Sequence, residues 1–317
     1  MLFAYPLIPE EDEAGGTPVW IDLVEPTPEE IAIAQARIGL PIPSFQDLSE
    51  IETSSRLKSK GDKLLLSAPL MTGSESNEPQ LSPVGFLLSP TLLVTVRFAD
   101  LKAFAAVTEE VAGMAELTAQ EAFLRLLEEV VDRQADHLER VGARLEQLAR
   151  DTFVRAAAKG GRATIDNSAL KRALAAIGGI GARLSMARDV LLGVGRIAPF
   201  AMERGNGCIG AVDKVRLGAI RQDVLSLDDY ETHLSNKSQF LLDAVLGLIN
   251  VAQNDIFKVL TIVSVVGIPP TLVASMYGMN FMHMPELSWA YGYPYALGLI
   301  VLSILLPLGW FKWRGWM

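Results

Sequence analysis

Two charge-free stretches near the C-terminus decide the fold: VLTIVSVVGIPPTLVASM at 259–276 and PYALGLIVLSILLPLGWF at 294–311. A helix that crosses a bilayer needs about 20 apolar residues at a rise of about 1.5 Å each, and both stretches approach that length. Aromatic residues flank them, as at membrane interfaces. These are Tyr277, Trp289, Tyr291, Tyr293, Trp310 and Trp313. We therefore predict two transmembrane helices, with a pair of buried core helices as the alternative.

The distribution of charge predicts the orientation of these helices. The last sixty residues carry a net charge of +2, with Glu286 as their acid and Lys258, Lys312 and Arg314 as their bases. The 317-residue chain carries −9, so residues 1–257 carry −11. The connecting loop, 277–293, has no lysine or arginine. Because basic residues favour the cytoplasmic side, we expect a multi-pass protein of the cell inner membrane with both termini in the cytoplasm and this loop outside.

Composition excludes several classes of protein. An acidic chain with a sequence pI near 5.0 lacks the positive charge that a nucleic-acid-binding protein needs. One cysteine and three histidines make a zinc site within one chain improbable, and the single cysteine rules out an internal disulfide framework. No histidine precedes His137, so no acid–base triad can form in the first part of the chain, and we expect a protein that is not an enzyme.

The soluble part divides into two predicted domains ahead of a membrane domain at 258–317. Residues 1–110 read as a cytoplasmic α/β domain, with strands expected at 19–24, 63–71, 84–88 and 91–97. Thr27 and Glu30 form a capping-box pattern that starts a helix, and Thr118 and Glu121 form another. Residues 111–257 read as a stalk of long helices, at about 118–158, about 167–200 and from about 212 into the membrane.

The third of these helices has two opposite faces when its positions are read in alternating steps of three and four. One face is mostly apolar and is expected to pack against other helices. It comprises Ile220, Val224, Leu227, Glu231, Leu234, Ser238, Leu241, Val245, Leu248 and Ala252. The other face, which we call the polar stripe, is polar or small at most positions. It comprises Gln222, Ser226, Asp229, His233, Asn236, Phe240, Asp243, Gly247, Asn250, Asn254, Phe257, Thr261, Ser264, Ile268, Thr271 and Ser275.

The polar stripe continues into the first membrane span, where lipid offers no hydrogen-bond partner. Its hydroxyls there must bond their own helix, join neighbouring helices or face a water-filled cavity. Continuity with Asn250 and Asn254 favours a helix that lines a pore along its length. A single helix cannot enclose a pore, so several copies of the chain would form a ring by cyclic symmetry.

The loop after the first span carries a specific motif. It reads Tyr277-Gly278-Met279-Asn280-Phe281, followed by MPEL at 284–287 and GYP at 292–294. This resembles the CorA family of magnesium channels, whose signature is Gly-Met-Asn at the outer end of the first of two C-terminal membrane helices. VWIDLVEP at 19–26 and EIETSSR at 50–56 resemble the N-terminal domain of the same family. The resemblance implies a funnel-shaped homopentamer, with an α+β cytoplasmic domain and long helices, that admits Mg²⁺ through its membrane helices.

The resemblance also implies roles for individual residues. Gly278, Met279 and Asn280 correspond to the selectivity filter, and Asp243 to a regulatory site where cytoplasmic Mg²⁺ closes the channel. The implied pore-lining positions are Asn254, Phe257, Leu260, Ile268 and Thr271, and the polar stripe adds Thr261 and Ser264. Leu260 lies beside Thr261, so the rotation of the helix stays open. For Asp243 the alternative is a solvated carboxylate, and for Asn280 a polar side chain that bonds the end of its own helix.

Some features of the loop depart from the family pattern. Met282 and His283 stand where many members have an acid and an aromatic residue, which leaves Glu286 as the loop's one acid. His283 is a solvated loop residue or a ligand for Zn²⁺, Co²⁺ or Ni²⁺, which favour imidazole. The main expectation is Mg²⁺ influx down the membrane potential, with Co²⁺ and Ni²⁺ as further candidate ions. The alternatives are a zinc transporter of the ZntB type and a membrane-anchored coiled-coil scaffold without transport.

Overall fold

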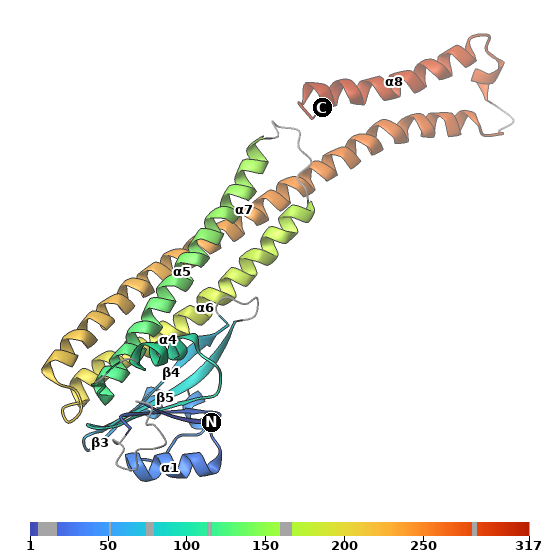
Figure 1. Cartoon of the computed structure of the whole chain (residues 1–317). Helices are drawn as coiled ribbons and strands as arrows, with labels where there is room; N and C mark the ends of the chain where they lie inside the picture. Colours follow the sequence, from blue (N-terminus) through green and yellow to red (C-terminus); the bar gives the residue numbers. More distant parts are fainter. Residues whose placement is uncertain are drawn as a thin grey trace. The chain divides into compact units, whose positions relative to one another are not determined.

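The computed structural model describes residues 1–5, 18–50, 52–73, 79–112, 114, 116–158, 167–280 and 284–316 (Figure 1). Its contacts divide the chain into two compact units. The first consists of residues 1–154 and 174–242, and the second of residues 155–173 and 243–317. The first unit contains a β-sheet and helices. The second contains both stretches that the sequence predicts to cross a membrane.

The sheet of the first unit has six strands in the order β1-β2-β6-β5-β4-β3. The strands are β1 (Leu2–Tyr5), β2 (Trp20–Val24), β3 (Leu57–Lys60), β4 (Lys63–Thr72), β5 (Gln80–Leu88) and β6 (Leu93–Arg97). The pair β2–β6 is parallel and the other pairs are antiparallel. The four predicted strands are confirmed as β2, β4, β5 and β6. The edge strands β1 and β3 were not predicted, because they are four residues long and β3 (LKSK) is mostly polar.

Helices cover both faces of this sheet (Figure 1). On one face Ala34 and Ile38 of α1 (Pro28–Ile38) pack in a core with Ile21 and Leu23 of β2. On the other face the ring of Phe86 lies 6.3 Å from that of Phe104, which belongs to α4 (Lys102–Val111). The short helices α2 (Phe45–Ser49) and α3 (Thr53–Arg56) connect α1 to β3.

Four long helices follow. They are α5 (Ala119–Ala158), α6 (Asn167–Arg204), α7 (Ala211–Tyr277) and α8 (Gly292–Trp313), with a short 3₁₀ helix, η1 (Pro285–Ser288), between the last two. The predicted start and end of each helix agree to within a few residues. Pro269 and Pro270 lie inside α7 without ending it, although proline cannot donate the main-chain hydrogen bond to the carbonyl four residues earlier. The carbonyls of Val265 and Val266 therefore lack that bond.

The sequence signals for helix starts have the expected geometry. Thr27 and Glu30 form a complete capping box, with the Thr27 N–H donating to Glu30 Oε2 at 2.8 Å. At the start of α5 the Glu121 N–H donates to Thr118 Oγ1 at 3.1 Å. The Glu121 carboxylate is bound by two arginines instead of closing the box.

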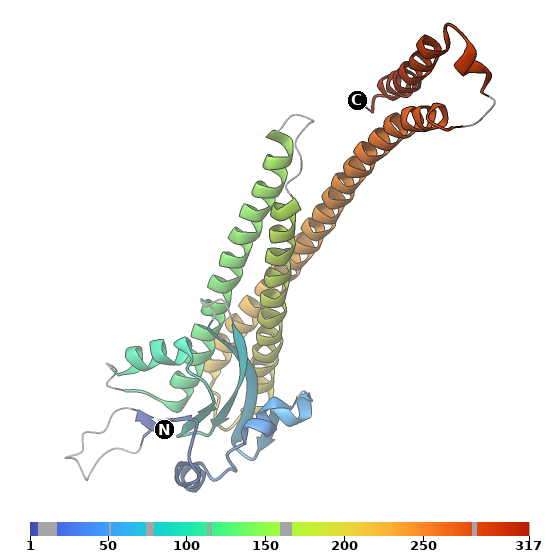
Figure 2. The ribbon, with the colours of Figure 1, turned by 90° about the vertical axis from the view of Figure 1, so that its right-hand side faces the viewer.

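Helix α6 packs directly on β4, and Figure 2 shows the two side by side. The contact depends on Gly193, since a Cβ at this position would lie 2.8 Å from Pro69 Cδ and 3.0 Å from Ala68 Cβ. A larger residue would push the helix away from the strand. The glycine thus fixes how closely α6 approaches the sheet.

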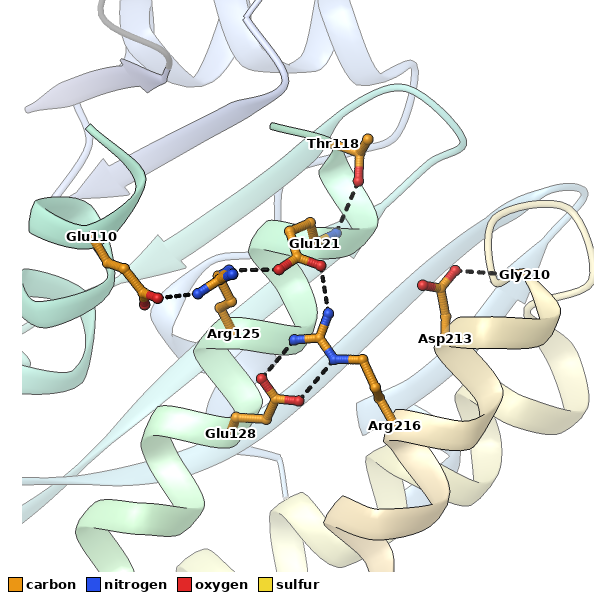
Figure 3. Close-up of polar contacts among 8 residues, drawn as sticks. All are labelled: Glu110, Thr118, Glu121, Arg125, Glu128, Gly210, Asp213 and Arg216. Atoms are coloured by element: carbon orange, nitrogen blue, oxygen red, sulfur yellow. Dashed lines mark hydrogen bonds and ion pairs between the residues drawn. The ribbon is translucent and has the colours of Figure 1, made fainter. Parts of the chain in front are cut away.

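An ion-pair network joins α4, α5 and α7 within the first unit (Figure 3). Arg216 of α7 binds Glu128 in a bidentate pair, at 2.9 Å from Nε and 2.6 Å from Nη2, and also binds Glu121. Arg125 connects Glu121, at 2.6 Å from its Nε, to Glu110 of α4. The three helices are thereby held together at the start of α7.

We expect Arg216→Met to destabilise the first unit by about 1–2 kcal/mol at neutral pH, because the bidentate pair is lost. Burial raises the pKa of Glu121, but hydrogen bonds and charge from Arg216 and Arg125 outweigh it and hold this pKa below its usual value. A lowered carboxyl pKa stabilises the fold above the unfolded value, near 4, and this contribution is lost as the pH falls. Thermal unfolding of the full chain in detergent at pH 7 and pH 4 checks this. The difference from wild type should shrink at pH 4, and Arg221→Met, at an exposed position of α7, should show no such change.

Candidate functional site

The two predicted faces of α7 differ sharply in burial. On the apolar face eight residues are buried and Leu227 and Leu248 are half-buried, so the predicted packing face is confirmed. Two of the eight buried residues are polar, Glu231 and Ser238. Every residue of the polar stripe from Gln222 to Ser275 is exposed, apart from Ser264, which is half-buried. Most of the stripe is therefore accessible to water, lipid or another chain.

Both membrane candidates are apolar and long enough to span a bilayer, and both are exposed. None of the 18 residues in the most apolar window of α7 is buried, and 6% of those in α8 are. A core helix of a soluble protein would be mostly buried, and a signal sequence would lie near the N-terminus. Neither description fits these helices, so two membrane spans remain as the interpretation.

Two hydroxyls of the stripe in the first span bond their own helix. Thr261 Oγ1 donates to the Phe257 carbonyl at 2.8 Å, and Thr271 Oγ1 donates to the Ile268 carbonyl at 2.7 Å. This is the self-bonding that the sequence left open as an alternative. It uses the hydroxyl proton, whereas the oxygen lone pairs remain available as acceptors for the water around a cation.

Large apolar side chains lie within the stripe and, at Leu260, beside it. Phe257, Leu260 and Ile268 are 64%, 60% and 62% exposed. Such exposure of large apolar groups is costly in water and acceptable against lipid or in a narrow pore. Leu260 and Thr261 are both exposed, so the burial of α7 does not choose between them.

The Gly-Met-Asn segment lies at the C-terminal end of α7. The Gly278 N–H donates to the Ala274 carbonyl at 3.0 Å, and the Met279 N–H to the Met276 carbonyl at 3.3 Å, so the last turn tightens. A Cβ on Gly278 would lie 3.3 Å from the Ala274 oxygen, a tight contact that a small shift of the backbone would have to relieve. Met279 and Asn280 are exposed. Phe281, Met282 and His283 lie outside the described residues, as does the side chain of Glu286 on η1.

Asp243 and Asn254 are also exposed on α7, on the N-terminal side of the predicted span. Among the described residues of one chain, no group of three or more histidine, cysteine, aspartate or glutamate side chains could hold a metal ion. An ion on the polar stripe would therefore meet single donors from each chain, and a complete site would need several copies.

The sequence interpretation missed one part of this region. Trp316, which follows α8, lines a groove on α7 together with Asn254, Phe257 and Thr261 of the polar stripe. The signal for it was Gly315, a glycine just after the last helical turn, where a left-handed residue commonly ends a helix.

Comparison with known proteins agrees with this architecture. A family model described as "CorA-like Mg2+ transporter protein" matches residues 15–313. The "Magnesium transport protein CorA" of Haemophilus influenzae is 33% identical over 311 residues, covering 97% of this chain and 95% of the relative. The CorA magnesium transporter structure from Methanocaldococcus jannaschii has a TM-score of 0.74 at 21% identity, covering 94% of this chain and 91% of that one.

The alternative interpretation, a zinc transporter of the ZntB type, has weaker support from the comparisons. The cytoplasmic domain of ZntB from Vibrio parahaemolyticus has a TM-score of 0.55 at 9% identity, covering 73% of this chain and 87% of that one, and this likeness concerns the fold alone. The predicted fold class, an α+β domain with long helices and two C-terminal membrane helices, is confirmed by the structure. The match over residues 15–313 and the identity across nearly the whole length confirm the resemblance, and the chain belongs to the CorA-like Mg²⁺ transporter family.

Proposed function

We propose that this protein carries Mg²⁺ across the cell inner membrane through a pore formed by several copies of α7, with five copies as the family resemblance implies. The observation that carries the proposal is the exposed polar stripe, which runs from Asn250 to Ser275 and ends at Gly278-Met279-Asn280. The relatives named as magnesium transport proteins support Mg²⁺ as the ion. The protein would not be an enzyme, because ion passage makes and breaks no covalent bond.

The chemistry of the stripe suits a hydrated divalent cation. Mg²⁺ gives up water reluctantly and usually keeps several water ligands when bound. Neutral acceptors, such as the Asn280 amide oxygen and the carbonyls of Gly278 and Met279, can bond these waters without holding the ion tightly. Conduction requires binding weak enough for release, and neutral acceptors hold a divalent ion less tightly than a ring of carboxylates would. The filter would therefore recognise the ion through the water molecules of its hydration shell.

The apolar positions and Asp243 suggest how such a pore closes. Rings of Phe257, Leu260 and Ile268 side chains would exclude water when the pore narrows, and a pore without water does not conduct ions. Asp243, which is exposed and precedes the first span in the chain, would bind cytoplasmic Mg²⁺ together with an acidic residue of a neighbouring copy. Binding that favours the closed state then reduces influx as the internal concentration rises.

Flux into liposomes tests the proposal. Liposomes that contain the purified protein and a Mg²⁺-sensitive dye should admit Mg²⁺ faster when their interior is negative. A membrane potential of 100 mV contributes about 4.6 kcal/mol to the entry of a divalent ion. Mg²⁺ loaded on the cytoplasmic face should slow the flux, and Asp243→Asn should weaken this inhibition. A panel with Co²⁺, Ni²⁺ and Zn²⁺ separates Mg²⁺ transport from zinc transport. A protein that carries none of these ions would be a membrane-anchored scaffold, and the proposal would be wrong.

A further inference from the structure

The C-terminal end of α8 closes with a complete Schellman motif. Gly315 has a φ of 71°, its N–H donates to the Lys312 carbonyl at 3.1 Å, and the Trp316 N–H donates to the Phe311 carbonyl at 3.0 Å. These are the two hydrogen bonds that define the motif. The apolar contact that accompanies it is present as well, because the Trp316 ring stacks on Phe311 with centroids 5.4 Å apart. The direction of Trp316 is thus fixed by the fold.

This motif places Trp316 against α7 within the second unit. Trp316 lines a groove with residues of the last two turns before the first span and with one residue just inside it. They are Val251, Asn254, Asp255, Phe257, Lys258 and Thr261. Of the residues of α8, only Gly292 and Phe311 are buried, and Phe311 is 1% exposed beneath Trp316. The end of α8 therefore buries an aromatic ring, while most of the helix exposes its side chains.

The groove lies on the flank of the polar stripe. At 100° per residue the centre of the groove lies about 60° around α7 from the centre of the stripe between Asn250 and Ser264. Asn254, Phe257 and Thr261 belong to both, whereas Asp255 and Lys258, which form an ion pair at 3.3 Å, lie outside the stripe. A contact on the flank of a helix opposes rotation of that helix about its own axis. Rotation by one position would exchange Thr261 for Leu260 on the pore side.

We propose that Trp316 is a positioning residue that fixes the rotation of α7 and so sets the closed constriction at Phe257. The inference rests on the proposed function, because it takes the polar stripe as the pore lining. An apolar ring excludes water only when every copy holds its side chain within a narrow range of orientations about the pore axis. Without Trp316 the copies would rotate independently, and the closed state would leak.

Two substitutions with matched controls test this in the full chain. Trp316→Ala removes the ring, and Gly315→Ala strains the left-handed position that the motif requires. Gly309→Ala changes an α8 glycine whose Cβ would meet nothing within 4 Å, and Trp313→Ala removes a neighbouring ring that is 83% exposed. Flux at inhibitory Mg²⁺ should rise about threefold or more in the first two variants, with unchanged flux when inhibitory Mg²⁺ is absent. Both controls should behave as wild type. A merely structural role would lower both fluxes together.

A cross-link reports the geometry without any transport. Trp316→Cys combined with Asp255→Cys should join within one chain through a short bifunctional thiol reagent, and adding Gly315→Ala should reduce the yield. The native Cys208 should stay unreacted, because burial and the charge of Asp62 raise its pKa to about 11. If wild type conducts Mg²⁺ but the leak is unchanged, or the pair does not cross-link, the inference is wrong. If wild type conducts no ion, the proposed function is wrong and the inference with it.

Discussion

Asn280→Ala is expected to reduce Mg²⁺ flux roughly 30-fold or more. The variant removes an exposed amide at the end of α7 and leaves the buried contacts of the chain untouched. Each lost hydrogen bond to the hydrated ion costs about 1 kcal/mol, and an ion on the axis of a ring would meet the amides of at least two copies. About 1.4 kcal/mol corresponds to a tenfold change, so two lost bonds already approach this reduction. Dye-reported influx into liposomes at fixed membrane potential measures it.

The control for this variant lies in the same loop. Ser288 is exposed on η1 and its hydroxyl donates to the Pro285 carbonyl at 2.9 Å, so Ser288→Ala should leave the flux within about twofold of wild type. Asn280→Asp keeps an acceptor and adds charge, and we expect tighter binding with slower release. Equal flux in wild type and Asn280→Ala, with both proteins folded, would show that Asn280 is not part of the filter.

Most of the fold could be predicted because its signals are local or periodic. The apolar face of α7 follows from spacing alone, and the capping box at Thr27 and Glu30 fixes where α1 starts. The sequence did not reveal pairings between distant segments. Arg216 binds Glu121 and Glu128, which lie about 90 positions away in the sequence, and no local pattern around these residues identifies their partners. Strand β1, four residues long, is likewise defined mainly by its pairing with β2.

The sequence predicted the helix face and the motif of the candidate site, but not how its side chains are arranged. Periodicity identified the polar stripe, and the Gly-Met-Asn motif lies at the C-terminal end of the helix that carries it. Side-chain hydrogen bonds of Thr261 and Thr271 to their own helix depend on rotamers, which spacing does not specify. The position of Trp316 depends on a left-handed glycine followed by a fold-back of the chain, and this brings together residues more than 50 positions apart.

A second large effect concerns a buried ion pair in the sheet of the first unit. Asp22 of β2 is 1% exposed, and Arg97 of the adjacent strand β6 donates to it from Nε at 3.0 Å. Thr95 Oγ1 donates to the other carboxylate oxygen at 2.6 Å, and Trp20 Nε1 donates to Thr95 at 3.0 Å. Burial raises the pKa of Asp22 above its usual value, and the charge of Arg97 opposes this rise without cancelling it.

Arg97→Met should therefore destabilise the fold by about 3–5 kcal/mol at pH 8, because it leaves a buried carboxylate without its cation. The pKa of Asp22 would rise further in this variant. A carboxyl whose folded pKa exceeds its unfolded value near 4 stabilises the fold while protonated, and this contribution is lost as the pH rises through the folded pKa. Thermal unfolding of the full chain in detergent should thus show the variant recovering from pH 8 to pH 5.

Two further variants separate the buried charge from the general effect of removing Arg97. Adding Asp22→Asn to Arg97→Met removes the uncompensated carboxylate, so the double variant should be more stable than Arg97→Met at pH 8 and nearly flat with pH. Asp100→Asn removes the other carboxylate near Arg97, at 3.4 Å and 97% exposed, and should have little effect. A cost for Arg97→Met that does not change between pH 5 and pH 8 would indicate lost packing against Phe104, whose ring centroid lies 5.1 Å from the guanidinium, as the dominant cause.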